Sequence, residues 1–320
     1  MESHIVRVYR NISYETFDES ERFMTLEQLR IFVEVAERQH LTQAAAVLAL
    51  TPSAVSAAIK TLEERYGTPL FDRVGRRIAL SEAGRIFLAE ARRTLASARA
   101  AEAALAELGG LKRGTLAIHA SQTIASYWLP PLLVRFRQAY PAIDLHVAPG
   151  NTQTVAQAVA QGGADLGFVE GAVDAPALAQ ETVGDDEMVA VVAPGHPWAD
   201  GRALDAGDLL GAEWILREEG SGTRSAFAAA LARHGVGIGA LRVALALPSN
   251  EAVRAAVTAG PFAAALSRLV VAPHLQAGTL VRANVALPPR AFYMLRHRER
   301  YTSKAAAAFL EMVSMVSLGK

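Results

Sequence analysis

One stretch of the chain, residues 42–67, constrains the fold more than any other: TQAAAVLALTPSAVSAAIKTLEERYG. Its apolar spacing predicts two short helices that meet at a tight corner. Thr42 is expected to cap the first helix. The second helix is expected to begin at Pro52, because the oxygen of Thr51 can accept from free amides of the first turn and proline there loses no needed donor.

The second of these helices has a small and polar outward face. We expect its buried stripe at helical spacing, on Val55, Ile59 and Leu62. The opposite face carries hydroxyl groups and one cation, on Ser53, Ser56 and Lys60. Such a face can approach base edges in the major groove of DNA closely. The spacing alone suits an ordinary helical hairpin equally well, so both interpretations stay open at this point.

A short basic segment follows the helix pair and alternates around Gly75 as a β-hairpin would. Its arginines could neutralise DNA phosphates, so the segment is typical of a wing beside a recognition helix. The residues predicted to contact DNA lie on both helices and on this wing: Thr42, Gln43, Thr51, Pro52, Ser53, Ser56, Lys60, Arg73, Arg76 and Arg77.

Several motifs occur together between residue 26 and about residue 88: an Ala-Ala pair, PSAVS, IKTLE, PLFDR and LSEAG. This segment resembles the winged helix-turn-helix of the LysR-type transcriptional regulators. The resemblance implies a DNA-binding domain over residues 24–80. Members of that family often carry arginine or glutamine just after PSAVS, where this chain has Ala57 and Ala58.

Composition sets limits on the remaining possibilities. The chain has 320 residues, of which 51% are hydrophobic, so it can build two or three domains with real cores. Its formal net charge of +0 argues against a chain that is basic all over, although a local basic patch suffices for DNA binding. It has no cysteine, which excludes disulfides, thiolate metal sites and thiol nucleophiles.

The sequence predicts a cytoplasmic location, because no apolar run approaches the roughly 18 residues of a membrane span and the first residues do not form a secretory signal. Residues 1–23 precede Met24, from which MTLEQLRIFV begins as members of the LysR family begin. This extension of uncertain status is either an artefact of an upstream start site or a real tail, and the residues do not decide between the two.

A long helix is expected over residues 81–110, with glycines after it that mark a boundary. At 1.5 Å per residue it is about 40 Å long, too long for a small head to cover. Its apolar residues form one stripe: Ala83, Phe87, Ala91, Leu95, Ala98, Leu105 and Leu108. The stripe either packs within its own chain or pairs with a second copy. We favour pairing, and therefore a homodimer or homotetramer, because paired heads fit pseudo-palindromic DNA sites.

Beyond Gly114 short apolar strands alternate with helices, so residues 114–320 are predicted to form an α/β domain with a largely parallel sheet in each of two lobes. Ligands gather at the carboxyl ends of such strands. Hydroxyl and amide groups are frequent at these ends, and each of them could equally be a helix cap. The residues predicted to bind an effector are Ser121, Thr123, Asn151, Thr152, Ser221, Thr223, Arg224 and Ser249.

This half is similar to the effector-binding domain of the LysR family, which folds like a two-lobed periplasmic solute-binding protein. The resemblance rests on GNTQTVAQAV, DLGFVEG and EEGSGTR, and it implies a small anion or carboxylate as effector. No clear lysine or arginine cluster is apparent in the sequence, but neutral donors alone can hold an anion. Arg224 adds one charge that could pair with an anion or form an exposed salt bridge instead.

No catalytic motif is present: the chain has no phosphate-binding GxxxxGK loop, no HExxH and no GxSxG. The acidic run Asp185, Asp186 and Glu187 is expected to be a solvated hinge rather than a metal site. We therefore expect no cofactor, no metal and no enzymatic activity. The sequence predicts an α/β protein with a winged helix-turn-helix, a linker helix and a sensor, which regulates transcription in response to a ligand. The alternative is a solute-binding protein without a regulatory role.

Overall fold

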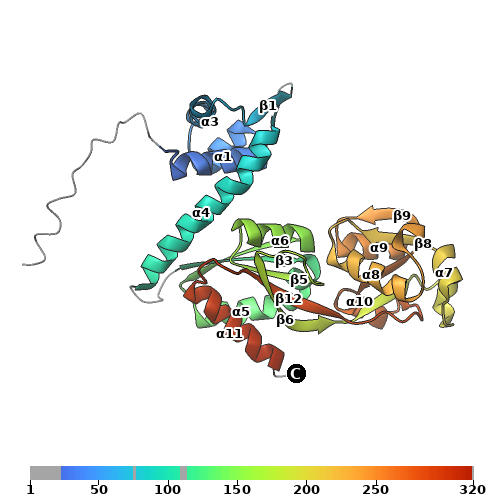
Figure 1. The fold of residues 1–320 in the computed structure, drawn as a ribbon. Helices are drawn as coiled ribbons and strands as arrows, with labels where there is room; N and C mark the ends of the chain where they lie inside the picture. The colour runs from blue at the N-terminus through green and yellow to red at the C-terminus, as the bar shows by residue number, and fades with distance from the viewer. Residues whose placement is uncertain (1–22, 75–76, 109–113, 319–320) are drawn as a thin grey trace, which may run out of the picture. The chain divides into compact units, whose positions relative to one another are not determined.

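The computed structural model describes residues 23–74, 77–108 and 114–318. Contacts divide the chain into two compact units, residues 1–95 and residues 96–320, and the helix α4 (Glu82–Leu108) runs through the division. The glycines predicted to end this helix, Gly109 and Gly110, lie outside the described residues, as does nearly all of the N-terminal extension. Figure 1 shows the elements along the chain, coloured from blue to red.

The first unit contains three helices followed by a two-stranded antiparallel sheet. These elements are α1 (Leu26–Arg38), α2 (Leu41–Leu48), α3 (Pro52–Tyr66), β1 (Phe71–Val74) and β2 (Arg77–Leu80). The predicted stripe of α3 is confirmed, since Val55, Ile59 and Leu62 are all buried. The predicted hairpin is confirmed as well, with Arg73 opposite Ile78 in the register.

Of the helix caps predicted at Thr42 and Thr51, the structure confirms only the second. Thr51 accepts a hydrogen bond from the amide of Ala54 at 3.2 Å and caps α3. The prediction for α2 is wrong by two residues, because His40 rather than Thr42 is its N-cap. The imidazole Nδ1 of His40 accepts from the amide of Gln43 at 3.5 Å, a long bond that leaves the hydroxyl of Thr42 exposed on the first turn.

Helix α4 begins in the core of the first unit and extends beyond it. The ring of Phe87 lies 4.7 Å from that of Phe32, which is fully buried. Ala91 is buried as well. Further along, Leu105 is 71% exposed, so the first unit covers only the first part of the predicted stripe.

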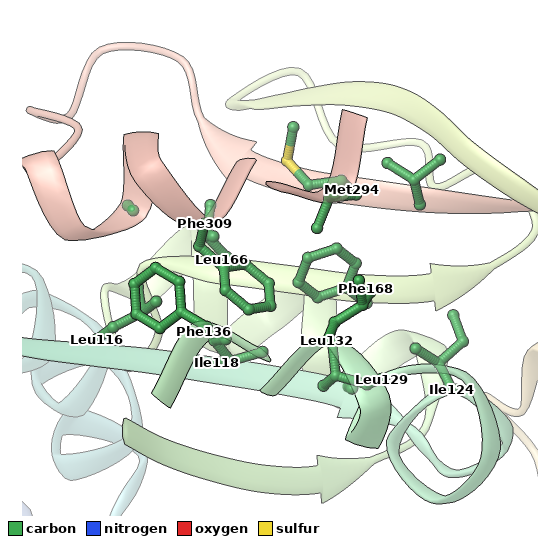
Figure 2. Close-up of a cluster of buried hydrophobic side chains, with 14 of the residues drawn as sticks. Leu116, Ile118, Ile124, Leu129, Leu132, Phe136, Leu166, Phe168, Met294 and Phe309 are labelled. Carbon is green, nitrogen blue, oxygen red and sulfur yellow. The ribbon is translucent and has the colours of Figure 1, made fainter. Parts of the chain in front are cut away.

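The second unit contains two five-stranded sheets, each the centre of one lobe. The first lobe has the strand order β4 (Ile143–Gly150), β3 (Gly114–Ser121), β5 (Leu166–Glu170), β12 (Arg290–His297) and β6 (Leu178–Asp186). Its helices are α5 (Pro130–Ala139), α6 (Thr152–Gln161) and α11 (Lys304–Leu318), with a π-helix over Ile124–Trp128. Figure 2 shows its core, where the side chains of Phe136, Phe168 and Phe309 meet.

The second lobe has the strand order β11 (Val281–Arg282), β7 (Met188–Val192), β10 (Ala263–Ser267), β8 (Glu213–Arg217) and β9 (Arg242–Leu247). Its α-helices are α7 (Ala206–Gly211), α8 (Gly222–Arg233), α9 (Asn250–Ala259) and α10 (Arg268–Gln276). Short 3₁₀ turns cover Pro197–Asp200 and Ile238–Ala240.

The expectation of largely parallel sheets is wrong, because both sheets are mixed. β12 runs antiparallel to both β5 and β6, and β7 runs antiparallel to both β10 and β11. The reason is the path of the chain, which crosses from the first lobe to the second after β6 and returns as β12. The segments LAIHA, DLHVAP, DLGFVE, MVAVVAP, WILRE and FYMLRH are expected from the sequence to be strands, and they form β3, β4, β5, β7, β8 and β12. Strands β6, β9, β10 and β11 were not predicted.

Among the described residues no single helix is long and apolar enough to cross a membrane. The bent pair of α2 and α3, with 108° between its helices, meets the criteria of length and composition together. These two helices form the core of the first unit with α1.

Candidate functional site

The outward face of α3 is polar and open. Ser53, Ser56 and Lys60 are exposed, and the hydroxyl groups of Thr51 and Ser53 lie 3.0 Å apart at the start of the helix. Lys60 forms only a loose, exposed ion pair with Glu64, at 3.4 Å. These side chains are therefore free to meet an incoming partner. Thr42 and Gln43 are exposed on α2, Arg73 and Arg77 lie on the two paired strands, and Arg76 lies outside the described residues.

The second site is the seam between the two lobes of the second unit, called here the interlobe cleft. A groove of about 400 Å³ opens at its rim, lined by Thr152 and Gln153 from the first lobe and by Gly220 and Ser225 from the second. The amide of Gln153 donates to the carbonyl oxygen of Gly220 at 3.2 Å. The predicted polar strand ends of both lobes thus meet at one seam.

The amino end of α8 lies against the end of β5. A Cβ atom on Gly222 would come within 2.5 Å of both the carbonyl oxygen of Glu170 and the hydroxyl of Thr152. Glycine is therefore required at this position for the lobes to approach this closely. Thr152 donates its hydroxyl proton to the same carbonyl oxygen of Glu170, at 3.2 Å.

Two of the predicted serines are buried in the cleft, and their hydroxyl groups carry no described hydrogen bond. Ser121, at the end of β3, is 2% exposed, and its Oγ has no partner among the described residues. Ser221 is the N-cap residue of α8 and is also 2% exposed, yet its side chain makes no capping bond. A buried hydroxyl without a partner costs free energy, so these groups are available for a bound ligand.

Two buried arginines also lie in the cleft. Arg217 ends β8 and is 4% exposed. It donates to both carboxylate oxygens of Glu218, at 2.7 and 2.9 Å, and to Asn250 Oδ1 at 2.6 Å. Asn250 in turn donates from Nδ2 to Thr123 Oγ1 at 3.1 Å, across the cleft in the first lobe.

The second buried arginine, Arg290, begins β12 and pairs with Asp186 at the end of β6. Its Nε donates to Asp186 Oδ2 at 2.8 Å, and its Nη1 donates to Thr223 Oγ1 at 3.0 Å. Ser267 donates to the other oxygen of Asp186 at 2.7 Å. Asp186 and Arg290 therefore lie where the chain leaves the first lobe and where it returns. Each also bonds to the second lobe: Asp186 accepts from Ser267, and Arg290 donates to Thr223.

The interpretation of the acidic run as solvated is wrong for Asp186, which is 4% exposed. Burial raises the pKa of its carboxyl group, the Arg290 guanidinium opposes that shift, and the nearby buried carboxylate of Glu170 adds to it. Asp185 is exposed. Glu187 is partly exposed, and its two ion pairs, to Arg268 and Arg282 at 2.8 Å each, hold its pKa below the usual value.

The remaining predicted effector residues have structural partners. Ser249 caps α9 through a bond from the amide of Ala252 at 3.0 Å. Asn151 caps α6 and also donates across the cleft to Glu218 Oε1 at 3.3 Å. Arg224 donates to the carbonyl oxygen of Arg217 at 3.1 Å. Asn151 and Arg224 thus form hydrogen bonds with other protein groups at the cleft.

Arg217 and Arg290 were not singled out in the sequence, and Asn250 was noted only as a polar residue after a strand. A signal was present, since Arg217 follows the apolar run from Trp214 to Leu216 directly, a position where an unpaired charge would be costly. Its partners, however, come from segments far along the chain and cannot be read from spacing.

Two family models match the chain. Residues 26–85 match the bacterial regulatory helix-turn-helix protein, lysR family, and residues 109–316 match the LysR substrate binding domain. The uncharacterized HTH-type transcriptional regulator YeiE of Escherichia coli (strain K12) is 39% identical over 290 residues, covering 90% of this chain and 96% of that protein. The RuBisCO operon transcriptional regulator of Allochromatium vinosum is 32% identical over 292 residues, covering 91% and 95%.

Solved structures share the fold. CbnR, a LysR family transcriptional regulator, superposes with a TM-score of 0.66 at 20% identity, over 92% of this chain and 99% of that chain. CbnR has also been solved in complex with its target DNA, with a TM-score of 0.65 at 21% identity over 92% and 100% of the two chains. The regulatory domain of CcmR from Synechocystis PCC6803 in complex with 2-PG gives 0.59 at 26% identity, over 64% and 98%.

Proposed function

Since the chain belongs to the LysR family of DNA-binding transcriptional regulators, we propose that a small anion bound in its interlobe cleft controls how it binds promoter DNA. The family consists of regulators, which argues against the alternative of a solute-binding protein without a regulatory role. Gene regulation places the protein in the cytoplasm.

In this proposal the outward face of α3 lies in the major groove and the wing follows the phosphate backbone. The support is the exposure of Ser53, Ser56 and Lys60 on a helix whose other face is buried. Small hydroxyl side chains can hydrogen-bond base edges, and arginines on the wing neutralise phosphates regardless of sequence.

Two copies pair through the distal part of α4. The apolar stripe of this helix continues past the first unit to Leu105, which is 71% exposed and needs cover. Light scattering on the full chain at micromolar concentration is expected to give at least a dimer. Leu105→Glu should lower the mass, and a monomeric wild-type protein would contradict the proposal.

One observation carries the proposal of an anionic effector: buried hydroxyl groups without protein acceptors lie beside buried cations in a cleft between two lobes. Ser121 and Thr223 are both 2% exposed, and Arg290 donates to the hydroxyl of Thr223. An anion held across the seam would stabilise the closed arrangement of the lobes. CcmR, whose regulatory domain shares the fold, has been solved with the small molecule 2-PG.

The test begins with a thermal-shift screen of the full chain against sulfite, sulfate, phosphate and small carboxylates. Calorimetry on the best ligand then compares Ser121→Ala and Thr223→Val with the wild type. Losing one charge-assisted hydrogen bond should weaken binding about ten- to a hundredfold. Thr258→Val is the control, because Thr258 is exposed on α9 and bonds only to its own helix. Full affinity in both cleft variants would place the site elsewhere.

A further inference from the structure

Both buried arginines of the cleft are held by protein groups at the seam between the lobes. The three nitrogens of the Arg217 guanidinium donate to Glu218 and Asn250. Arg290 donates to Asp186 and Thr223, and its Nη2 also lies 2.7 Å from Asp186. Both guanidinium groups are therefore oriented by protein partners, and they act on a ligand through these neighbours as well. The Nη2 of Arg290 is buried and makes no hydrogen bond among the described residues, so it too would need an acceptor.

The hydrogen bonds beside the arginines have a fixed direction, because a guanidinium can only donate. Asn250 accepts from Arg217 with its oxygen, so its amide nitrogen must face Thr123 and donate to it. Arg290 donates to Thr223 without an intermediate. In both cases the threonine oxygen is the acceptor, and the direction cannot reverse while the arginine is present.

Each of these two hydroxyl groups then has one proton left to give. Thr123 is 0% exposed and Thr223 is 2% exposed, and neither donates to a protein acceptor among the residues that the structure describes. Thr152 differs from these two threonines, because its hydroxyl group already donates to the carbonyl oxygen of Glu170. The two threonines with an arginine behind them are thus obligatory donors, and a buried donor needs an acceptor.

We propose that Arg217 and Arg290 are positioning residues that make the cleft select ligand oxygens which carry no proton. The inference rests on the proposed binding of an anion in this cleft and names the chemical class: an oxyanion whose bound oxygens are all acceptors. A ligand O–H group that faces Thr123 or Thr223 would place two hydrogen-bond donors opposite each other, with no acceptor between them. Such a mismatch in a buried site removes a hydrogen bond and leaves its groups unpaired.

Inorganic sulfate and inorganic phosphate test this selection, because they have similar size and shape while phosphate retains a proton near neutral pH. Calorimetry on the full chain should show that sulfate binds about ten- to a hundredfold more tightly than phosphate. The dissociation constant of phosphate divided by that of sulfate should fall as pH rises and phosphate loses protons. Sulfate affinity should change less over the same range.

Variants of the relay show whether the arginines set this ratio. In Arg217→Met the amide of Asn250 is free to turn, so Thr123 can accept as well as donate, and the ratio should fall severalfold towards one. Arg217→Lys keeps an obligatory donor and should restore the ratio even if both affinities drop. Asn250→Asp, nearly identical in shape, gives the proton of Thr123 an acceptor within the protein and should also lower the ratio. If Arg217 had a purely structural role, these variants would weaken the binding of both anions equally and leave the ratio unchanged.

The outcomes separate this inference from the proposed function. Equal affinity for the two anions in the wild type, with both weakened by Thr223→Val, would overturn the selection and leave an anion site in the cleft. An unchanged ratio in folded Arg217→Met and Asn250→Asp would overturn the role of Arg217. Absence of binding by sulfate and phosphate would overturn this inference alone, since the proposed function also covers sulfite and small carboxylates. Binding of both anions that Thr223→Val does not change would overturn both proposals.

Discussion

The outward face of α3 and the interlobe cleft hold their polar side chains in different ways. On α3, Ser53 and Ser56 are exposed and are placed by the helix to which they belong. In the cleft, Arg217 and Arg290 are buried and are held by Asn250 and Thr223, which lie 33 and 67 positions away in the sequence. A change on α3 should therefore alter recognition and little else, whereas a change in the cleft should alter stability and recognition together.

The strongest test of this difference is Arg290→Met. The substitution leaves the buried carboxylate of Asp186 without its cation, and Glu170, also buried, lies near the same guanidinium at 3.8 Å. Removing one partner of a buried ion pair typically costs about 3 to 5 kcal/mol of unfolding free energy. Urea unfolding of the full chain measures this loss. Arg282→Met is the matched control, because Arg282 is 54% exposed in its ion pair with Glu187 and should change stability by about 1 kcal/mol or less.

The same variant has a pH dependence with a definite sign. Burial raises the pKa of Asp186 above its ordinary value of 3.8, and the Arg290 guanidinium lowers it. Without Arg290 the pKa rises further, so protonation favours the folded state more strongly. The free energy of unfolding of Arg290→Met should therefore fall as pH rises above the ordinary pKa of 3.8, by more in total than that of the wild type. A parallel pH profile in both proteins would contradict the assignment of this ion pair.

On the DNA-binding side, the triple variant Arg73→Ala, Arg76→Ala and Arg77→Ala should weaken binding to all duplex sequences by about ten- to a hundredfold. Each lost phosphate contact should also reduce the salt dependence, so the slope of log affinity against log salt should flatten by about 0.9 per contact. Gel shifts at several salt concentrations measure both quantities. Arg233→Ala, at the end of α8, serves as control and should leave the slope unchanged.

The smallest expected effect is that of Ser53→Ala or Ser56→Ala. Each loses one hydroxyl from the outward face of α3, so discrimination between related DNA sites should change by about 1 kcal/mol, or about fivefold. Competition binding with a set of single-base variants of one site measures this discrimination. Thr94→Ala on α4 is the comparison, because its hydroxyl bonds to its own helix. Stability should change by less than about 0.5 kcal/mol in the serine variants, in contrast to Arg290→Met. A large loss of stability in either serine variant would contradict the proposed difference between α3 and the cleft.

The sequence predicted the first site better than the second for a physical reason. The cap at Thr51, the proline at the next position and the buried stripe of α3 all depend on neighbours within a few residues. Strand β6 was missed because LAQETVGDD is polar over most of its length, and it forms a strand through its pairing with β12. The exchange of strands between lobes also produced the mixed sheets. Neither effect is visible in local periodicity.

The cleft shows the same limit in its side chains. The polar strand ends at Ser121 and Thr223 could be found from composition, and their contact with a ligand stays a prediction. The charges behind them could not be found, because the partners of Arg290 lie 67 and 104 positions away in the sequence. Even the acidic run was ambiguous, since only the fold decides that Asp186 is buried while Asp185 is exposed.

The close approach of Gly222 to Glu170 has a consequence for genetics. Because backbone oxygen cannot move aside as a side chain can, any larger residue at Gly222 has to separate the two lobes or shift α8. Such a substitution would hold the lobes apart at the proposed effector site. A selection for regulators that no longer respond to their inducing molecule should therefore recover changes at this glycine codon repeatedly, alongside changes that destroy the protein outright.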